Sequence, residues 1–168
     1  MSVKLVTIGL SHYCEKARWA LDRSGLEYVE EAHPPIVHYL STIRHRTRRT
    51  LPALLTPHGT LRDSTEILKW IDSMVSNGAR LYPDDPTMRA DVEALEDLFD
   101  ESLGPATRRW AYSWALHDRP LMLELMSRMA TKRDVALLRA GAPLIIPFLT
   151  RGLRLSDEAI DKSLARVA

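Results

Sequence analysis

The order of apolar runs and helices in the first eighty residues most constrains what this chain can fold into. Residues 3–10 form a short run rich in β-branched residues that stops at Gly9, which is typical of a buried strand. The further elements predicted in chain order are a helix from 11 to 25, a strand at 26–31, a weak helix at 36–42, a hairpin that turns at 57–59 and a helix from 63 to about 77. A strand–helix–strand unit followed by a hairpin and a covering helix predicts an α/β domain with a mixed four-stranded sheet and three helices.

The pattern changes after the turn-rich segment "LYPDDP" at 81–86 and becomes entirely helical. One long helix is predicted towards His117, with Met88, Val92, Leu95 and Phe99 on one face. A second helical region covers 121–141, and prolines at 143 and 147 are expected to break or kink the next segment of chain. A last helix starts at Ser156, and its apolar stripe has no later helix to cover it. We therefore expect a first domain at 1–80, a linker at 81–85, and an all-α domain at 86–168 that is only partial.

Composition narrows the class of protein. The chain has 168 residues, of which 45% are hydrophobic, and 23 basic side chains balance 22 acidic ones. A net charge of +1 gives no field that would recruit nucleic acid or an anionic membrane. A single cysteine excludes an intrachain disulfide and fits a reducing compartment. The most apolar run, at 142–149, contains two prolines and is too short to span a bilayer. These features predict a soluble cytoplasmic protein, with neither nucleic acid nor a membrane as partner.

The segment "SHYCEKAR" at 11–18 concentrates the residues that could do chemistry. Ser11 precedes a predicted helix, where unpaired backbone N–H groups and the helix dipole favour an anion. Its hydroxyl could donate a hydrogen bond to a bound thiolate, or it could only cap the helix. Cys14 is either a reactive thiol, since a helix N-terminus lowers the pKa of a thiol, or a small core residue. No second cysteine is present for dithiol chemistry.

Two further positions have a functional and a purely structural interpretation. Pro52 opens a predicted strand. Proline has no N–H for strand pairing, so it is expected there only at the strand start or beside a ligand. A cis peptide bond before Pro52 would expose the backbone of Leu51 to a peptide ligand. Asp63 and Ser64 begin a helix, where Asp63 with Glu66 fits a capping box. The same residues could instead hold a carboxylate and an ammonium group.

The remaining polar clusters are less specific. The run "RHRTRR" at 44–49 is typical of a solvated loop, and it could also supply a cation to a small acidic ligand. The six histidines show no metal-ligand spacing with cysteine or acidic partners, so we predict no metal site.

Taken together, these segments resemble the glutathione S-transferase family. "SHYCEKARWAL" resembles the family's "S-P-[FY]-C-x-[KR]-x-R-x-x-L" helix opening, and "TLPALL" resembles its "V-P-x-L" segment with a cis-proline. "LRDSTEILKWI" is similar to "L-x-[EQ]-S-x-x-I-x-x-Y-[IL]", and "LYPDDP" is similar to the segment that leads into the family's helical domain. The resemblance covers residues 1–82 and implies a thioredoxin-like N-terminal domain followed by a helical domain. Family members continue past residue 168, so the second domain is expected to be truncated.

The resemblance also implies a site for each part of glutathione. Ser11 would donate its hydrogen bond to the glutathione thiolate, and Cys14 would be structural. The cysteinyl backbone would lie on Leu51 beside cis-Pro52, and the γ-glutamyl end would meet Asp63 and Ser64. Arg49 is near the basic position that meets the glycyl carboxylate. Two residues depart from the pattern: His12 replaces a proline, and Asp63 is one methylene shorter than the usual glutamate or glutamine.

The implied activity is attack of the glutathione thiolate on a small, largely apolar electrophile. Glutathione would be a co-substrate, no metal would take part, and the protein would be a homodimer. Two alternatives stay open. One is a module without catalysis that keeps the transferase fold to bind glutathione or another protein. The other is a thiol–disulfide reductase that uses Cys14, although a serine occupies position 11.

Overall fold

The first domain is built on a four-stranded mixed sheet in the order β2-β1-β3-β4. The computed structural model describes residues 3–76, 78, 80–127 and 131–167. Strand β1 (Val3–Ile8) is parallel to β2 (Tyr28–His33) and antiparallel to β3 (Ala53–Thr56), which pairs in turn with β4 (Gly59–Leu61). The predicted mixed sheet and hairpin are confirmed. The second strand was predicted at 26–31 and begins two residues later.

Three helices pack on this sheet. Helices α1 (His12–Ser24) and α3 (Ser64–Met74) contact each other, and their buried residues meet Leu5 of β1 and Leu54 of β3 in the main core. Helix α1 ends at Gly25, which adopts the left-handed conformation (φ 70°) that favours glycine. Helix α2 (His38–Arg44) begins two residues later than predicted, because Ile36 also has a left-handed backbone (φ 73°) and cannot start a helix.

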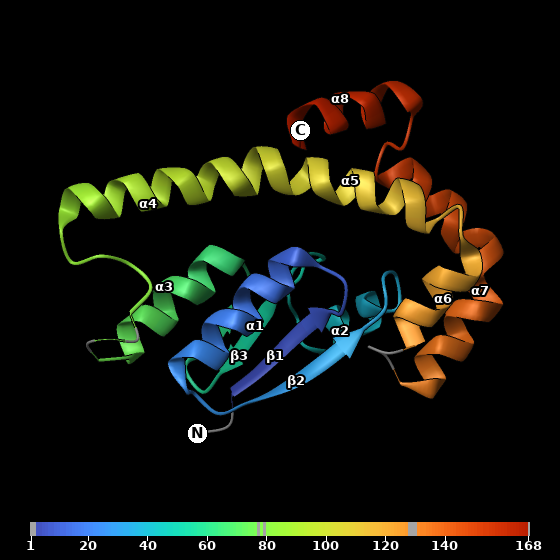
Figure 1. Ribbon diagram of the computed structural model, residues 1–168. Coiled ribbons are helices and arrows are strands. Elements are labelled where there is room, and N and C mark those ends of the chain that lie inside the picture. Colours follow the sequence, from blue (N-terminus) through green and yellow to red (C-terminus); the bar gives the residue numbers. More distant parts are fainter. Residues whose placement is uncertain (1–2, 77, 79, 128–130, 168) are drawn as a thin grey trace.

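The second domain consists of helices, and its first part is a long rod that crosses the first domain (Figure 1). The rod runs through α4 (Pro86–Leu98), one π-helical segment η1 (Phe99–Leu103) and α5 (Gly104–Ala115). It confirms the single long helix predicted towards His117, apart from the π-helical segment. Beyond it lie α6 (Arg119–Ser127), α7 (Lys132–Gly152) and α8 (Asp157–Val167).

Of the expectation that two prolines would break or kink this segment, helix α7 corrects the break. Pro143 and Pro147 both lie inside this 21-residue helix. The surrounding turns hold the backbone in the helical conformation, so the helix tolerates the loss of two N–H donors. By length and composition alone α7 could also cross a membrane, so the size of the run at 142–149 does not exclude a span. One such helix is weak evidence for a span, and little of α7 is buried, although it packs against α6 and lines a cavity.

Helix α8, whose apolar stripe is expected to have no later helix to cover it, packs against the earlier helix α5, although Leu164 of that stripe stays exposed. It lies along the outer side of α5 (Figure 1), and Ser163 in its centre is fully buried. The Arg109 guanidinium donates to the Ser163 hydroxyl at 2.7 Å and to the Leu153 carbonyl at 3.3 Å. The helical domain is therefore closed on this side by its own last helix.

A polar network holds the rod on the first domain. The Lys16 ammonium lies 2.6 Å from the Glu96 carboxylate and 2.8 Å from that of Asp100. Glu96 also accepts hydrogen bonds from the Thr65 hydroxyl at 2.8 Å and the Tyr82 hydroxyl at 2.6 Å. Burial raises the pKa of Glu96, but these donors outweigh burial and hold that pKa below its usual value. Glu96 is therefore the ionised centre of the contact between the domains.

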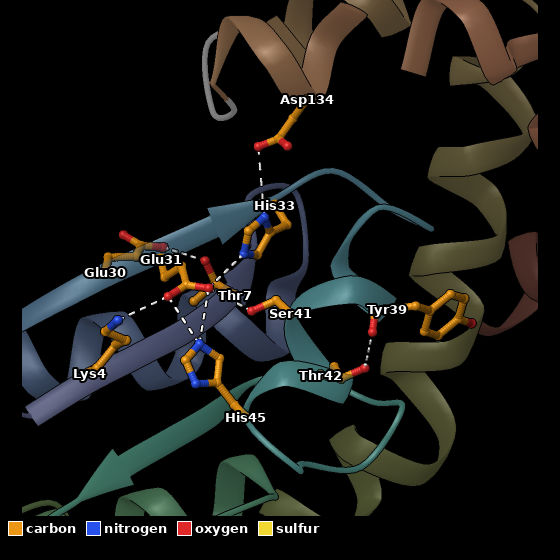
Figure 2. A network of polar contacts seen from close by, with 10 residues as sticks. All are labelled: Lys4, Thr7, Glu30, Glu31, His33, Tyr39, Ser41, Thr42, His45 and Asp134. Atoms are coloured by element: carbon orange, nitrogen blue, oxygen red, sulfur yellow. Dashed lines mark hydrogen bonds and ion pairs between the residues drawn. The ribbon is translucent and has the colours of Figure 1, made fainter. Parts of the chain in front are cut away.

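A second polar cluster surrounds Glu31 on β2 (Figure 2). Its carboxylate accepts from Lys4 at 3.0 Å, from Ser41 at 2.6 Å and from His45 at 3.2 Å. His33 donates to it at 3.0 Å, while the other nitrogen of the same ring lies 3.8 Å from Asp134 of α7. Burial raises the pKa of Glu31, but its four donors lower it well below the usual range. This Glu31 cluster fixes α2 to the sheet.

Candidate functional site

The residues predicted for the site line two adjoining cavities between the first domain and the helices above it. The smaller cavity, of about 260 Å³, is lined by Pro52, Asp63 and Ser64. The larger, of about 580 Å³, is lined by Ser11 and Arg49. Four residues line both: Tyr13, Thr50, Leu51 and Arg108. The fold thus brings all six predicted residues to one connected region.

Ser11 is the N-cap residue of α1, but its side chain makes no capping hydrogen bond. The Ser11 N–H donates to the Ile8 carbonyl at 3.0 Å, and its own carbonyl accepts from the Glu15 N–H at 2.9 Å. The capping interpretation is therefore right for the backbone alone. The hydroxyl makes no capping hydrogen bond but interacts with the Cys14 sulfur, and Ser11 lines the larger cavity.

Cys14 is fully buried, in a small cluster with Val6 and Ala53, and it lines neither cavity. The Ile8 N–H donates to its sulfur at 3.3 Å. Burial raises the pKa of the Cys14 thiol, and hydrogen bonds from Ile8 and Ser11 offset only part of that rise. A buried, protonated thiol is a poor nucleophile, so the geometry disfavours the reductase alternative.

The loop before β3 carries Leu51 and Pro52, and the peptide bond between them is cis. Both residues precede the paired part of β3, in which Ala53 is the residue opposite Val6. His38 of α2 supports this loop, because its Nε2 lies 3.2 Å from the Arg49 carbonyl and must donate to it. Burial lowers the pKa of His38, so the ring is neutral near pH 7. This support was not predicted from the sequence.

Asp63 and Ser64 lie at the start of α3, as predicted. Asp63 is the N-cap residue and accepts from the Thr65 N–H at 2.9 Å through Oδ1. The predicted capping box differs in detail, because Glu66 accepts from the Arg62 N–H at 3.0 Å instead of from that of Asp63. Asp63 is exposed and Ser64 is buried, and both line the smaller cavity. Capping by Asp63 occupies only one of its two carboxylate oxygens.

The two cavities differ in charge. The smaller one is lined by two carboxylates, Asp63 and Asp100, and by two guanidinium groups, Arg62 and Arg108. Such a set of charges suits an amino-acid zwitterion, which carries an ammonium and a carboxylate on one carbon atom. The described lining of the larger cavity contains two arginines and no aspartate or glutamate.

Several residues of the site were not found from the sequence. Tyr13 lies two residues from Ser11, and its hydroxyl donates to the Asp100 carbonyl at 2.8 Å. Gly104 permits this approach, since a Cβ there would lie 2.5 Å from the Tyr13 hydroxyl oxygen. Tyr13 could have been proposed from its place in the opening segment. The residues from the helical domain gave no such signal, because their contribution depends on how the rod crosses the first domain; they are Arg108, Trp110, Tyr112 and Phe148.

The described part of the chain contains no group of three or more histidine, cysteine, aspartate or glutamate side chains placed to hold a metal ion.

Comparisons with known proteins agree with this fold. Residues 5–78 match the family described as glutathione S-transferase, N-terminal domain. The match identifies residues 5–78 as a glutathione S-transferase N-terminal domain. No curated protein sequence matches the chain.

Solved structures extend the likeness to nearly the whole chain. The β-etherase LigF from Sphingobium sp. strain SYK-6 is 20% identical with a TM-score of 0.67, over 99% of this chain and 69% of that one. The tau class glutathione S-transferase from mango, Mangifera indica, is 19% identical with a TM-score of 0.57, over 98% of this chain and 86% of that one. A glutathione S-transferase from Methylobacillus flagellatus KT, solved with glutathione bound, is 19% identical with a TM-score of 0.54, over 98% of this chain and 64% of that one. At these identities the likeness establishes the shared fold.

Proposed function

We propose that the chain binds glutathione from the smaller cavity to the adjoining edge of the larger one, and transfers it through its thiolate to an electrophile in the larger cavity. The observation that carries this proposal is the position of Ser11. Its hydroxyl makes no capping hydrogen bond, and Ser11 lines the larger cavity, which shares Leu51 with the smaller one. The solved structure from Methylobacillus flagellatus KT, which has the same fold and holds glutathione, supports the choice of ligand.

Each part of glutathione has a counterpart in the site. The γ-glutamyl zwitterion meets Asp63 and Ser64 in the cavity that carries both signs of charge. The cysteinyl backbone pairs with the main chain of Leu51 beside Pro52. The glycyl carboxylate meets the guanidinium of Arg49, which is exposed at the edge of the larger cavity. These contacts aim the thiol at Ser11.

Catalysis then consists of control of the thiol pKa and positioning. A free thiol has a pKa near about 8.5, so only a small fraction is ionised at neutral pH. The Ser11 hydroxyl can rotate from the Cys14 sulfur to donate to the glutathione sulfur, and this stabilises the thiolate. The thiolate forms a bond to the electrophilic carbon, and the leaving group departs with the electron pair of the broken bond.

Dimerisation is part of this proposal. Helix α4 contains no buried residue, although the structure describes it from end to end. Val92 and Leu95 of α4 and Phe99 of η1 line a cavity together with Trp19 of α1. All three are exposed, as are Met88 and Leu98 of α4. A second copy of the chain would cover this face, since contiguous apolar surface of this kind marks interaction sites. We place the protein in the cytoplasm, where glutathione is abundant and its lone cysteine stays reduced.

The direct test is the pKa of glutathione bound to the protein, followed through the ultraviolet absorbance of the thiolate. We expect the bound thiol to titrate at least about one pH unit below free glutathione in the natural chain. Ser11→Ala should return the bound thiol to the free value while binding persists. Ser73→Ala, which removes an exposed hydroxyl of α3 outside both cavities, should change nothing. Binding with an unshifted thiol would favour a module without catalysis.

A further inference from the structure

We propose that the larger cavity selects an aromatic electrophile that carries a carboxylate, and that Arg108 is the residue that recognises this anion. The proposal rests on the proposed function, since it assigns the second substrate of the same site. It stands on three features of the cavity: its aromatic walls, the sign of its charges, and a guanidinium with no ion-pair partner among the described residues.

Four aromatic side chains line the larger cavity and not the smaller one. Tyr39 contributes from α2, Trp110 and Tyr112 from α5, and Phe148 from α7. Rings from three helices thus surround a volume of about 580 Å³, which lies in the range of ordinary small-molecule sites. A planar aromatic ligand would bury the most apolar surface there and could stack on these rings.

The charges of this cavity have one sign. Its described lining has no acidic side chain, and Arg49 and Arg108 are its only groups that are always charged. His12 also lines it, but burial and the nearby Arg108 cation lower the pKa of that histidine, so the ring is neutral near pH 7. An anion in this cavity therefore meets two cations, while the carboxylates of Asp63 and Asp100 line the adjoining smaller cavity.

Arg108 is available to bind such an anion. None of the ion pairs or side-chain hydrogen bonds among the described residues involves it, whereas its neighbour Arg109 is engaged by Leu153 and Ser163. Arg108 is exposed and lies on the side of α5 that lines both cavities. Its planar guanidinium matches a carboxylate through two parallel hydrogen bonds. Arg49 lies on the loop of the first domain and serves the glycyl carboxylate in the proposed function.

The arrangement separates recognition from reaction. The carboxylate stays on Arg108 throughout, while the ring lies against the aromatic walls and places an electrophilic carbon before the glutathione sulfur. The carbon–sulfur bond forms, and the bond to the leaving group breaks with its electron pair on that group. Arg108 thus positions the electrophile and takes no proton.

The test compares two probes of the same shape, 2-naphthoate and its neutral amide 2-naphthamide, by calorimetric titration with and without saturating glutathione. We expect the natural chain to bind the naphthoate at least about tenfold more tightly than the amide, because a charge-assisted pair is added. Arg108→Gln should abolish this preference and leave amide binding unchanged. Arg139→Gln removes an exposed guanidinium of α7 outside the cavity and should keep the preference.

Equal binding of the two probes, or a preference that survives Arg108→Gln, would overturn the proposal. A separate titration with glutathione distinguishes it from the proposed function. If Arg108→Gln weakens glutathione binding and leaves the preference for naphthoate intact, Arg108 belongs to the glutathione site and the inference is wrong. If the naphthoate preference holds and no glutathione binds, the cavity assignment stands and the proposed function fails.

Discussion

The two halves of the molecule build their shares of the site in different ways. In the first domain, the sheet and three helices enclose a core of fully buried side chains, and the site residues are tied to element ends: Ser11 at the start of α1, Leu51 before β3, and Ser64 at the start of α3. In the helical domain, few described side chains are buried, and the site receives residues from the middle of α5 and from the C-terminal end of α7. A well-packed scaffold can fix ligand geometry, while a loosely covered helical wall determines what shape and charge fit beside it.

This difference has a physical consequence. A residue at an element end is held by hydrogen bonds of the backbone, so replacing its side chain leaves its neighbours in place. A residue in the middle of a wall helix depends on how the rod lies on the first domain. That position rests mainly on the contacts of Glu96 and Asp100 with Lys16 and Thr65.

The largest expected effect tests the contrast in packing. Ile67→Ala removes a fully buried side chain from the core between α1, α3 and the sheet, and it should cost about 2–5 kcal/mol of unfolding free energy. Leu144→Ala truncates a side chain of α7 that is 81% exposed, and it should change stability by less than about 0.5 kcal/mol. Urea denaturation of both variants measures the two values. Equal losses would mean that the helical domain is packed in solution as tightly as the first.

A smaller effect is expected where the two halves join. Glu96→Ala leaves the donors of Lys16, Thr65 and Tyr82 without their acceptor, and it should cost about 1–3 kcal/mol. Glu101→Ala removes an exposed carboxylate from the neighbouring turn of the rod and serves as the matched control. Denaturation followed separately by tryptophan fluorescence and circular dichroism would show the loss. An unchanged stability of the Glu96 variant would show that the network does not hold the rod.

The Glu31 cluster gives a dependence on pH with a definite sign. The pKa of Glu31 is lowered in the folded chain, so its contribution is complete above the unfolded value of about 4.3 and is lost as the pH falls below it. Glu31→Gln should therefore lower stability by about 1–2 kcal/mol at pH 7 and make the acid side of the stability curve flatter. Glu27→Gln, at an exposed position, should follow the natural chain. Thermal melts between about pH 3 and 7 distinguish the stability curve of the natural chain from the flatter curve expected for Glu31→Gln.

The smallest effect is expected at the contact between the same cluster and α7. The Asp134 carboxylate lies 3.8 Å from His33 Nδ1, which has no hydrogen-bond partner among the described residues. Asp134→Asn should change stability by less than about 0.5 kcal/mol, since an ion pair this long contributes little. A loss above about 1 kcal/mol in the same melts would show that this contact holds α7 against the first domain.

Prediction from the sequence worked for the first domain and failed for the helical wall of the site. The residue order around Ser11, Pro52 and Asp63 specified the strands, the caps and the cis bond, because these depend on local backbone preferences and on a recognisable motif. Arg108 and Phe148 could not be placed, because no local pattern fixes how a rod and a later helix cross a sheet. The prolines of α7 misled the prediction for a related reason: packing and neighbouring turns override the local preference of proline.

The measurement that tests the central claim most directly is a calorimetric titration of the chain with reduced glutathione. It is carried out on the natural chain, on Ser64→Ala from the first domain and on Trp110→Ala from the helical wall. We predict saturable binding that is weakened at least about fivefold in Ser64→Ala and is unchanged in Trp110→Ala. No binding heat and no thermal shift at high glutathione, or a loss confined to Trp110→Ala, would contradict the assignment of the glutathione site to the first domain.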